Sequence, residues 1–209
     1  MNFTPDIVTK ILEPYCRCVS RHQCDQISRY IDLLTRWNRR VSLTAVDKPE
    51  EILRFHFGES IFALQYCDFS AGRLADVGSG AGFPGLALKI LRPELKVVLI
   101  EPNLRKSAFL AEVVRSLELD SVEVISKPFA ESAIPANSLQ FVTSRALSQS
   151  SAFLSWSMSA LQAGGRLVLW ASSDAAPQIS EDACFVWSAP VIIPGTKRRA
   201  LLIGRRLPG

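Results

Sequence analysis

The chain has 209 residues, of which 48% are hydrophobic, and its formal net charge is +4 at pH 7. This length suffices for one full hydrophobic core and is too short for two large domains. No apolar run approaches the roughly 20 residues that span a bilayer, and the start MNFTPDIVTK lacks the basic and apolar segments of a leader peptide, so we expect a cytoplasmic protein without membrane contact.

Five scattered cysteines argue against a disulfide framework and favour a reducing compartment. Four potential zinc ligands lie close together near the N-terminus: Cys16, Cys18, His22 and Cys24. They lack the C-x₂₋₄-C pairs, separated by a long gap, that structural zinc sites use. We therefore predict free thiols and no metal site.

Residues 1–70 are predicted to form an N-terminal helical cap. In residues 24–40, CDQISRYIDLLTRWNRR, apolar side chains recur at steps of three and four and form one stripe of a helix. A further helix is predicted from Pro49 through EEILRFHFGESIFALQY, because proline and acidic residues both favour the first turn.

From residue 73 the pattern changes to short apolar runs that alternate with amphipathic stretches. Such runs are typical of buried parallel strands joined by crossover helices, which predicts a doubly wound α/β sheet. The five predicted strands are RLADV, KVVLI, SVEVI, LQFVT and RLVLW.

The end of the chain predicts an antiparallel hairpin, since CFVWSAPVIIP and RRALLIGRR are joined by the short turn Pro194-Gly195. Five parallel strands closed by such a hairpin are similar to the class I, Rossmann-like fold of S-adenosylmethionine-dependent methyltransferases. Classical dinucleotide domains use a sixth parallel strand instead. We assign this fold to residues 71–209.

The stretch LADVGSGAGFPGLAL lies at the end of the first predicted strand and contains a G-x-G-x-x-G match. Glycines here allow the backbone to turn tightly and to approach a ligand, which makes Gly78, Gly80 and Gly82 candidate cofactor residues. A helix is expected from Phe83 to Leu91, and its N-terminus would present free N–H groups. These features suit either a dinucleotide or another adenosyl cofactor.

Two acidic residues bear on that choice. A carboxylate at Asp76 would repel a pyrophosphate but would hold the ammonium group of a methionine moiety. Glu101 directly follows the second strand, where a carboxylate accepts hydrogen bonds from both ribose hydroxyls of any adenosyl ligand. Asp76 therefore favours S-adenosylmethionine over a dinucleotide, whereas Glu101 indicates an adenosyl ligand without choosing between the two.

Four segments carry a closer resemblance: DVGSGAGFPG, YIDLLTRWNRRVSLTAVDKPEEILRFHFGES, SRAL and GTKRRALLI. With them the chain resembles the bacterial small-subunit ribosomal RNA guanine-N7 methyltransferase family, also called the glucose-inhibited division protein B family. The resemblance spans nearly the whole chain. It implies methyl transfer from S-adenosylmethionine to N7 of a guanine in 16S ribosomal RNA, with S-adenosylhomocysteine as the second product.

The resemblance also implies cofactor contacts in the glycine loop and after the third and fourth strands: Gly78, Phe83, Ala130, Glu131 and Arg145. The segment SKPFAES, which holds two of these positions, is one residue longer than the usual family segment. Glu131 has the alternative interpretation of a solvated acid at a helix start. Arg145 is expected to hold a carboxylate of the methyl donor or to donate to guanine O6.

Guanine N7 carries a lone pair and no proton, so the implied reaction needs neither a general base nor a metal. We therefore predict no catalytic acid or base, and we expect catalysis by alignment and by exclusion of water. An Asn-Pro-Pro-Tyr type motif is absent from the fourth strand end, which agrees with an aromatic nitrogen as the nucleophile.

Clustered arginines beside an aromatic side chain are typical of surfaces that bind phosphate-rich partners. The candidates for contact with 16S ribosomal RNA or the small subunit are Arg36, Arg39, Arg40, His56, Lys197, Arg198 and Arg199. Each has a plainer interpretation. The arginines around Trp37 are alternatively a solvated face. Lys197, Arg198 and Arg199 are alternatively the charged edge of a strand, and His56 is alternatively a hydrogen-bonded packing residue.

Two positions depart from the family pattern. Trp170-Ala171 replaces a usual Lys-Gly pair and offers a stacking face in place of a cation, and Ser42 replaces a usual asparagine. The change at Trp170 motivates an alternative hypothesis, a non-catalytic RNA- or ribosome-binding protein that keeps cofactor affinity. We expect the protein to be a monomer. A third hypothesis, an NAD-dependent oxidoreductase, depends only on GAGFPG and Glu101.

Overall fold

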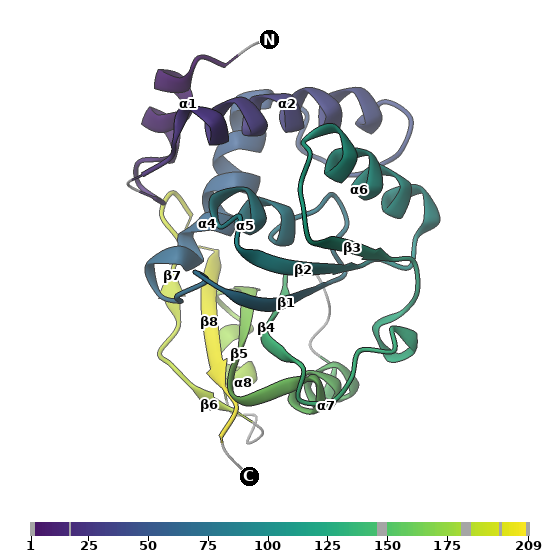
Figure 1. Cartoon of the computed structure of the whole chain (residues 1–209). Coiled ribbons are helices and arrows are strands. Elements are labelled where there is room, and N and C mark those ends of the chain that lie inside the picture. The colour runs from purple at the N-terminus through teal and green to yellow at the C-terminus, as the bar shows by residue number, and fades with distance from the viewer. Residues whose placement is uncertain (1–2, 17, 146–149, 181–184, 197, 208–209) are drawn as a thin grey trace.

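The computed structural model describes residues 3–16, 18–145, 150–180, 185–196 and 198–207. A mixed sheet forms the centre of the molecule, with the N-terminal helices on one face and two later helices on the other (Figure 1). Parts of two quoted segments, residues 146–147 of SRAL and Lys197 of GTKRRALLI, lie outside the described residues, as does Cys184.

The parallel part of the sheet has five strands. They are β1 (Gly72–Val77), β2 (Leu95–Ile100), β3 (Val122–Ile125), β4 (Leu139–Ser144) and β5 (Leu161–Ser172). The sheet order is β3-β2-β1-β4-β5-β8-β6, so β2 and β3 lie on one side of β1 and the later strands lie on the other. All five predicted strands are confirmed, and their carboxyl ends meet at one edge.

The predicted terminal hairpin is also confirmed. β8 (Arg199–Arg205) runs antiparallel to β5, with Leu201 opposite Trp170. Its hairpin partner is split into β6 (Val186–Trp187) and β7 (Val191–Ile192), which both pair with β8. Pro190 lies between these two pieces and cannot donate to a strand ladder, which explains the interruption.

The helices before β1 follow the prediction closely. They are α1 (Pro5–Leu12), α2 (Arg21–Asn38), and a continuous helical segment made of α3 (Pro49–Glu51), η1 (Ile52–Gly58), α4 (Glu59–Ile61) and η2 (Phe62–Gln65). η1 is a π-helix, a widened turn that often occurs at functional sites. α2 begins with a capping box between Ser20 and Gln23.

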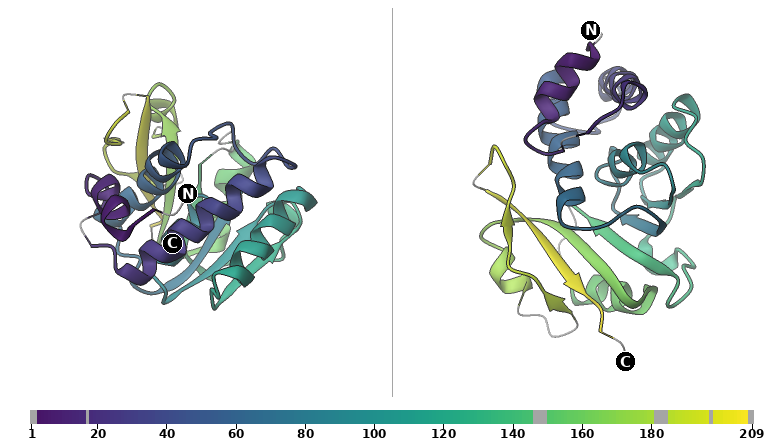
Figure 2. Two further views of the ribbon diagram at one scale, coloured as in Figure 1. Left: turned by 90° about the horizontal axis from the view of Figure 1, so that it is seen from above. Right: turned by 60° about the vertical axis from the view of Figure 1, so that its left-hand side comes forward.

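These helices share one core with the sheet. Tyr30 and Phe57 from the N-terminal segment, and Phe109 from α6 (Leu104–Ser116), are fully buried in the same apolar cluster. A second cluster lies under α7 (Ser151–Ala160) and α8 (Ala176–Ile179) on the opposite face. The right-hand view of Figure 2 shows the N-terminal helices packed over the sheet. Because the core is continuous, the division into residues 1–70 and 71–209 stays a prediction.

Across the described ranges, no helix is both long and apolar enough to cross a membrane. In the same ranges, no three histidine, cysteine or acidic side chains gather as potential metal ligands. The four described cysteines are free thiols: Cys16, Cys18, Cys24 and Cys67.

Candidate functional site

The glycine loop connects β1 to α5 (Gly85–Leu91) at the carboxyl edge of the sheet. Gly78, Gly80 and Gly82 all have positive φ values, of 72°, 55° and 87°. The helix begins at Gly85, so the predicted start at Phe83 is wrong by two residues. The N–H of Phe83 instead closes a turn onto the carbonyl oxygen of Ser79, at 3.2 Å.

Two of these glycines differ in their surroundings. A Cβ atom at Gly82 would lie 2.1 Å from the hydroxyl oxygen of Tyr30, because this hydroxyl donates to the carbonyl of Ala81 at 2.6 Å. A Cβ atom at Gly80 would meet only the carbonyl oxygen of Gly78, at 3.8 Å. Gly82 therefore packs the loop against α2, whereas Gly80 faces open space.

Asp76 is fully buried in β1 below the loop. Its carboxylate accepts hydrogen bonds from the hydroxyl of Thr143 at 2.8 Å and from the N–H of Gly85 at 3.2 Å. Burial raises the pKa of this carboxyl to about 6, although the bonds from Thr143 and Gly85 oppose the shift. The carboxylate thus braces the start of α5, and its predicted contact with a methionine ammonium stays a prediction.

Asp76→Asn is expected to change how stability depends on pH. The folded-state pKa of about 6 lies above the unfolded value of 3.8, so this group favours the folded state most below pH 3.8 and loses that contribution as pH rises through 6. The variant should therefore gain about 2 kcal/mol of unfolding free energy relative to wild type between about pH 4 and about pH 7.5. Denaturant unfolding of both proteins at the two pH values measures this change. If the difference in unfolding free energy between the variant and wild type were the same at both pH values, the prediction would be wrong.

Glu101 follows β2 and lies beside the glycine loop. One oxygen of its carboxylate accepts from the N–H of Gly80 at 2.8 Å, and the other accepts from the N–H of Asn103 at 2.9 Å. Asn103 in turn caps α6. The predicted ribose-binding carboxylate is therefore held at the same edge as the open side of the loop.

The turn that follows β3 holds two further predicted cofactor-binding residues. Ala130 and Glu131 lie in an exposed turn, η3 (Phe129–Glu131), that follows β3. β3 pairs with β2 so that Ile125 lies opposite Ile100, the residue before Glu101. The structure thus brings the loop, Glu101 and this turn to one edge of the sheet.

Phe83 lies between the loop and the N-terminal helices. Its ring stacks on Tyr30, with centroids 5.3 Å apart, and on His56, with centroids 5.0 Å apart. The guanidinium carbon of Arg145 lies 5.6 Å from the ring centroid. Only 4% of Phe83 is exposed, so its side chain fixes the loop against these groups.

Arg145 follows β4 and is held by the π-helix η1. It donates to Nδ1 of His56 at 2.8 Å and to the carbonyl of Phe55 at 3.2 Å. Because Arg145 has no acceptor, Nδ1 of His56 accepts and Nε2 donates to the hydroxyl of Thr44 at 2.7 Å. Burial, together with the charge of Arg145, lowers the pKa of His56 to about 3, so the ring is neutral at physiological pH. These bonds give His56 an orienting role toward Arg145; its contact with RNA stays a prediction.

Sequence reasoning missed Glu59, which lies on α4 and is only 2% exposed. Its carboxylate accepts from Arg199 at 2.7 Å and lies 3.9 Å from Arg145. Burial raises the pKa of Glu59, and the two arginines oppose that shift. An acid within the apolar run FHFGESIF was the signal that could have identified it.

Trp170 does not offer the stacking face expected from the sequence. Its side chain is buried, with 3% exposure, and its Nε1–H donates to the carbonyl of Glu59 at 2.7 Å. The register of β5 against β8 turns this position toward the core that contains Leu201. A pocket of about 330 Å³ lies at this end of β5 and is lined by Arg145, Trp170, Ala171, Ser172, Arg198 and Arg199.

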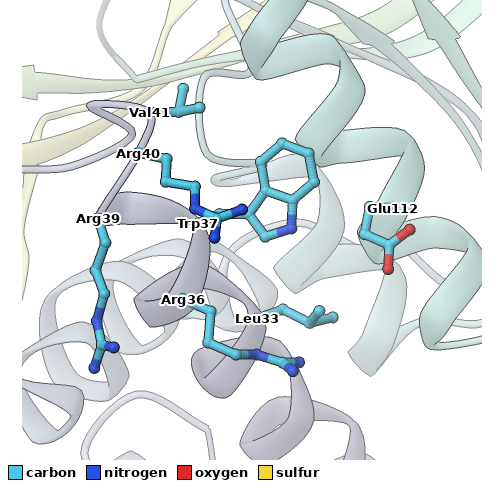
Figure 3. Close-up of a pocket in the computed structure, with 7 residues that line it drawn as sticks. All are labelled: Leu33, Arg36, Trp37, Arg39, Arg40, Val41 and Glu112. Carbon is cyan, nitrogen blue, oxygen red and sulfur yellow. The ribbon is translucent and has the colours of Figure 1, made fainter.

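The other basic group lies at the end of α2. Arg36, Arg39 and Arg40 surround Trp37 and line a separate pocket, in which Glu112 of α6 lies across from them (Figure 3). The arginines predicted near Trp37 are thus gathered in one place, apart from the glycine loop. Lys197 lies outside the described residues.

Comparison with known proteins gives consistent matches. A family model described as rRNA small subunit methyltransferase G (GidB) matches residues 23–189. Ribosomal RNA small subunit methyltransferase G of Desulfitobacterium hafniense (strain Y51) is 35% identical over 166 residues, which cover 78% of this chain and 69% of that protein. The protein of the same name from Chloroflexus aggregans (strain MD-66 / DSM 9485) is 33% identical over 196 residues, covering 88% of this chain and 82% of that protein.

Among solved structures, a SAM-dependent methyltransferase from Aquifex aeolicus superposes with a TM-score of 0.66. It is 20% identical in sequence, and the match covers 79% of this chain and 97% of that chain. This likeness shows the fold, and it confirms the class I sheet expected from the order of strands.

Proposed function

The chain belongs to the rRNA small subunit methyltransferase G family, and on that basis we propose that it transfers the methyl group of S-adenosylmethionine to N7 of a guanine in 16S ribosomal RNA. It is an S-adenosylmethionine-dependent methyltransferase of small-subunit ribosomal RNA. The position of the base and the nitrogen that is methylated are the parts of this proposal that go beyond the family's name.

One observation supports the cofactor site above the others. The open side of Gly80 and the carboxylate of Glu101 are adjacent at the carboxyl ends of β1 and β2, where open α/β sheets bind their ligands. The proposal places the ribose of the cofactor beside this carboxylate. The dinucleotide hypothesis has less support, because the sheet closes with antiparallel β8 and because Asp76 lies below the loop.

The proposed reaction forms a bond between N7 and the methyl carbon while the bond from that carbon to sulfur breaks, and its electron pair returns to sulfur. When bound, S-adenosylmethionine supplies this electrophilic methyl group. No proton leaves N7, so the chain's residues need only to hold the base in line and to exclude water. A donor aimed at N7 would block its lone pair, so the role proposed for Arg145 is toward guanine O6 or the cofactor carboxylate.

The test is methyl transfer from a labelled donor to undermethylated 30S particles and, in parallel, to the free RNA, followed by mapping of the modified base. We expect label on a guanine, with a methyl group at N7. Label on a pyrimidine or on protein would refute the proposal. We infer in addition that the protein works in the cytoplasm as a monomer, which light scattering during size exclusion checks.

The non-catalytic alternative is weakened by where Trp170 lies. Because Trp170 is buried, Trp170→Phe should remove its hydrogen bond to the Glu59 carbonyl and lower the free energy of unfolding by about 2 kcal/mol. The KM for RNA should stay within about twofold, since a side chain that RNA does not reach contributes no stacking. Thermal unfolding and methylation kinetics measure the two effects. A raised KM at unchanged stability would show that the indole meets RNA.

A further inference from the structure

The pocket at the end of α2, hereafter the α2 pocket, has a volume of about 510 Å³. Its walls are Leu33, Arg36, Trp37, Arg39, Arg40, Val41 and Glu112. The volume lies in the range of sites for small ligands, and Figure 3 shows the side chains that line the pocket. It has no part in the methyl-transfer chemistry described above.

The charge of the α2 pocket favours an anion. Within the described part of the chain, the guanidinium groups of Arg39 and Arg40 take part in no ion pair or hydrogen bond. The single acid of the pocket, Glu112, accepts from Arg115 at 2.8 and 2.9 Å, so its charge is already compensated. Arg39 and Arg40 therefore both line the pocket without an ion-pair partner in the described residues, and Arg39 also borders a neighbouring pocket that holds Asp47.

The pocket also holds an aromatic surface. Trp37 is partly exposed and packs on Phe109 of α6, with ring centroids 5.7 Å apart. This contact holds the indole against the core while the ring still lines the pocket. An aromatic ring beside free arginines is the arrangement that binds unpaired nucleotides, since bases stack on the ring and phosphates meet the cations.

Hydrogen bonds connect the pocket with Arg145. The side chain of Asn38, next to Trp37, accepts from the N–H of Thr44 at 3.0 Å and donates to its carbonyl at 2.9 Å. Thr44 bonds to His56, and His56 accepts from Arg145. A chain of hydrogen bonds thus runs from Asn38, the neighbour of Trp37, through Thr44 and His56 to Arg145.

We propose that the α2 pocket binds an unpaired nucleotide of the substrate RNA, with its base on Trp37 and its phosphate on Arg39 and Arg40, away from the guanine that is methylated. This inference depends on the proposed function for the identity of the RNA. A base within a duplex is already stacked and does not reach the indole, so the pocket discriminates in favour of single-stranded segments. It acts as an anchor for RNA and takes no part in the chemical step.

Direct binding tests the cations. We expect Arg39→Gln/Arg40→Gln to weaken binding of a fluorescein-labelled single-stranded RNA about tenfold and to reduce the slope of log affinity against log salt by about 0.7, which corresponds to one phosphate contact. The matched control is Lys10→Gln/Arg21→Gln, which removes the same charge from exposed positions on α1 and at the other end of α2. Equal losses in both double variants would overturn the proposal, because they would show a general charge effect.

Variants of Trp37 test the stacking. Trp37→Leu keeps an apolar contact with Phe109 but removes the aromatic face, and it should weaken single-stranded RNA binding about tenfold; Trp37→Phe should recover most of the loss. Thermal unfolding identifies any variant that fails to fold, in which case Trp37→Phe alone is compared with wild type on the single-stranded RNA and its duplex. Unchanged affinity in folded Trp37→Leu, or an equal loss for the duplex, would overturn the proposed stacking.

Kinetics separate this proposal from the proposed function. In the methylation assay, the double arginine variant should raise the KM for 30S particles while kcat and the calorimetric affinity for S-adenosylmethionine stay unchanged. A wild-type protein without methylation would refute the proposed function, yet the RNA-binding comparison would still decide on the α2 pocket. A loss of affinity for 30S particles with unchanged affinity for single-stranded RNA would overturn the pocket's assignment to RNA.

Discussion

Gly82→Ala is expected to lower the free energy of unfolding by about 2–5 kcal/mol. The added Cβ would lie 2.1 Å from the Tyr30 hydroxyl and 2.7 Å from a methyl carbon of Leu86, both in the packed core beneath the loop. Overpacking of this kind costs about 1–3 kcal/mol, and the φ of 87° at Gly82 adds about 1–2 kcal/mol for any residue with a Cβ. Denaturant unfolding measures the change.

The matched control for this variant is Gly80→Ala. Its φ is 55°, so it carries the backbone cost, but its Cβ would have only the Gly78 carbonyl within reach, at 3.8 Å. We expect a loss of about 1 kcal/mol. If the two alanine variants were equally stable, the packing of Gly82 against Tyr30 would not hold the loop in place.

Gly80→Asp is expected to weaken binding of S-adenosylmethionine at least about 100-fold while the protein stays folded. The new side chain would enter the open space beside the loop and set a second carboxylate near Glu101, which accepts from the Gly80 N–H. Two carboxylates side by side repel each other, and the new side chain takes up the space in which the loop backbone would approach the ligand. Both effects oppose binding. Isothermal titration calorimetry measures the affinity.

A second glycine supplies the control for Gly80→Asp. Gly164 also has a positive φ, of 77°, and nothing lies within 4 Å of a Cβ built there. It lies near the start of β5, away from the carboxyl edge that holds the loop. Gly164→Asp should therefore cost a similar amount of stability and leave cofactor affinity unchanged. Retained affinity in Gly80→Asp would mean that the cofactor binds elsewhere.

The sequence predicted the sheet because its signals are local. Each parallel strand is a near-continuous apolar run, and the glycine loop is defined by neighbours such as Asp76 and Gly78 within a few residues. The helix start was misplaced by two residues because Pro84 suits a first turn, while the turn closed by Ser79 depends on the folded loop.

The side-chain network around Arg145 could not be predicted in the same way. Glu59 gains its role from Arg199, which is 140 positions later in the chain, and Trp170 is buried because β8 fixes which face of β5 meets the core. Residue type alone assigned a solvent-facing role to Trp170. Pairing between distant segments determines the burial and the partners of such residues. The periodicity within one segment carries no information about that pairing.

The bond between Glu59 and Arg199 also bears on the order in which the protein is completed during translation. Arg199 opens β8, which follows every other strand in the described chain and yet inserts between β5 and β6. Until β8 leaves the ribosome, the buried acid on α4 has no arginine from β8, and the edge of β5 has no neighbour on that side. Domains fold as units with the N-terminal part emerging first, so the helices and parallel strands of a nascent chain would lack this last strand until β8 emerges. The bond between Glu59 and Arg199, and with it this part of the site, would thus form only after β8 has emerged.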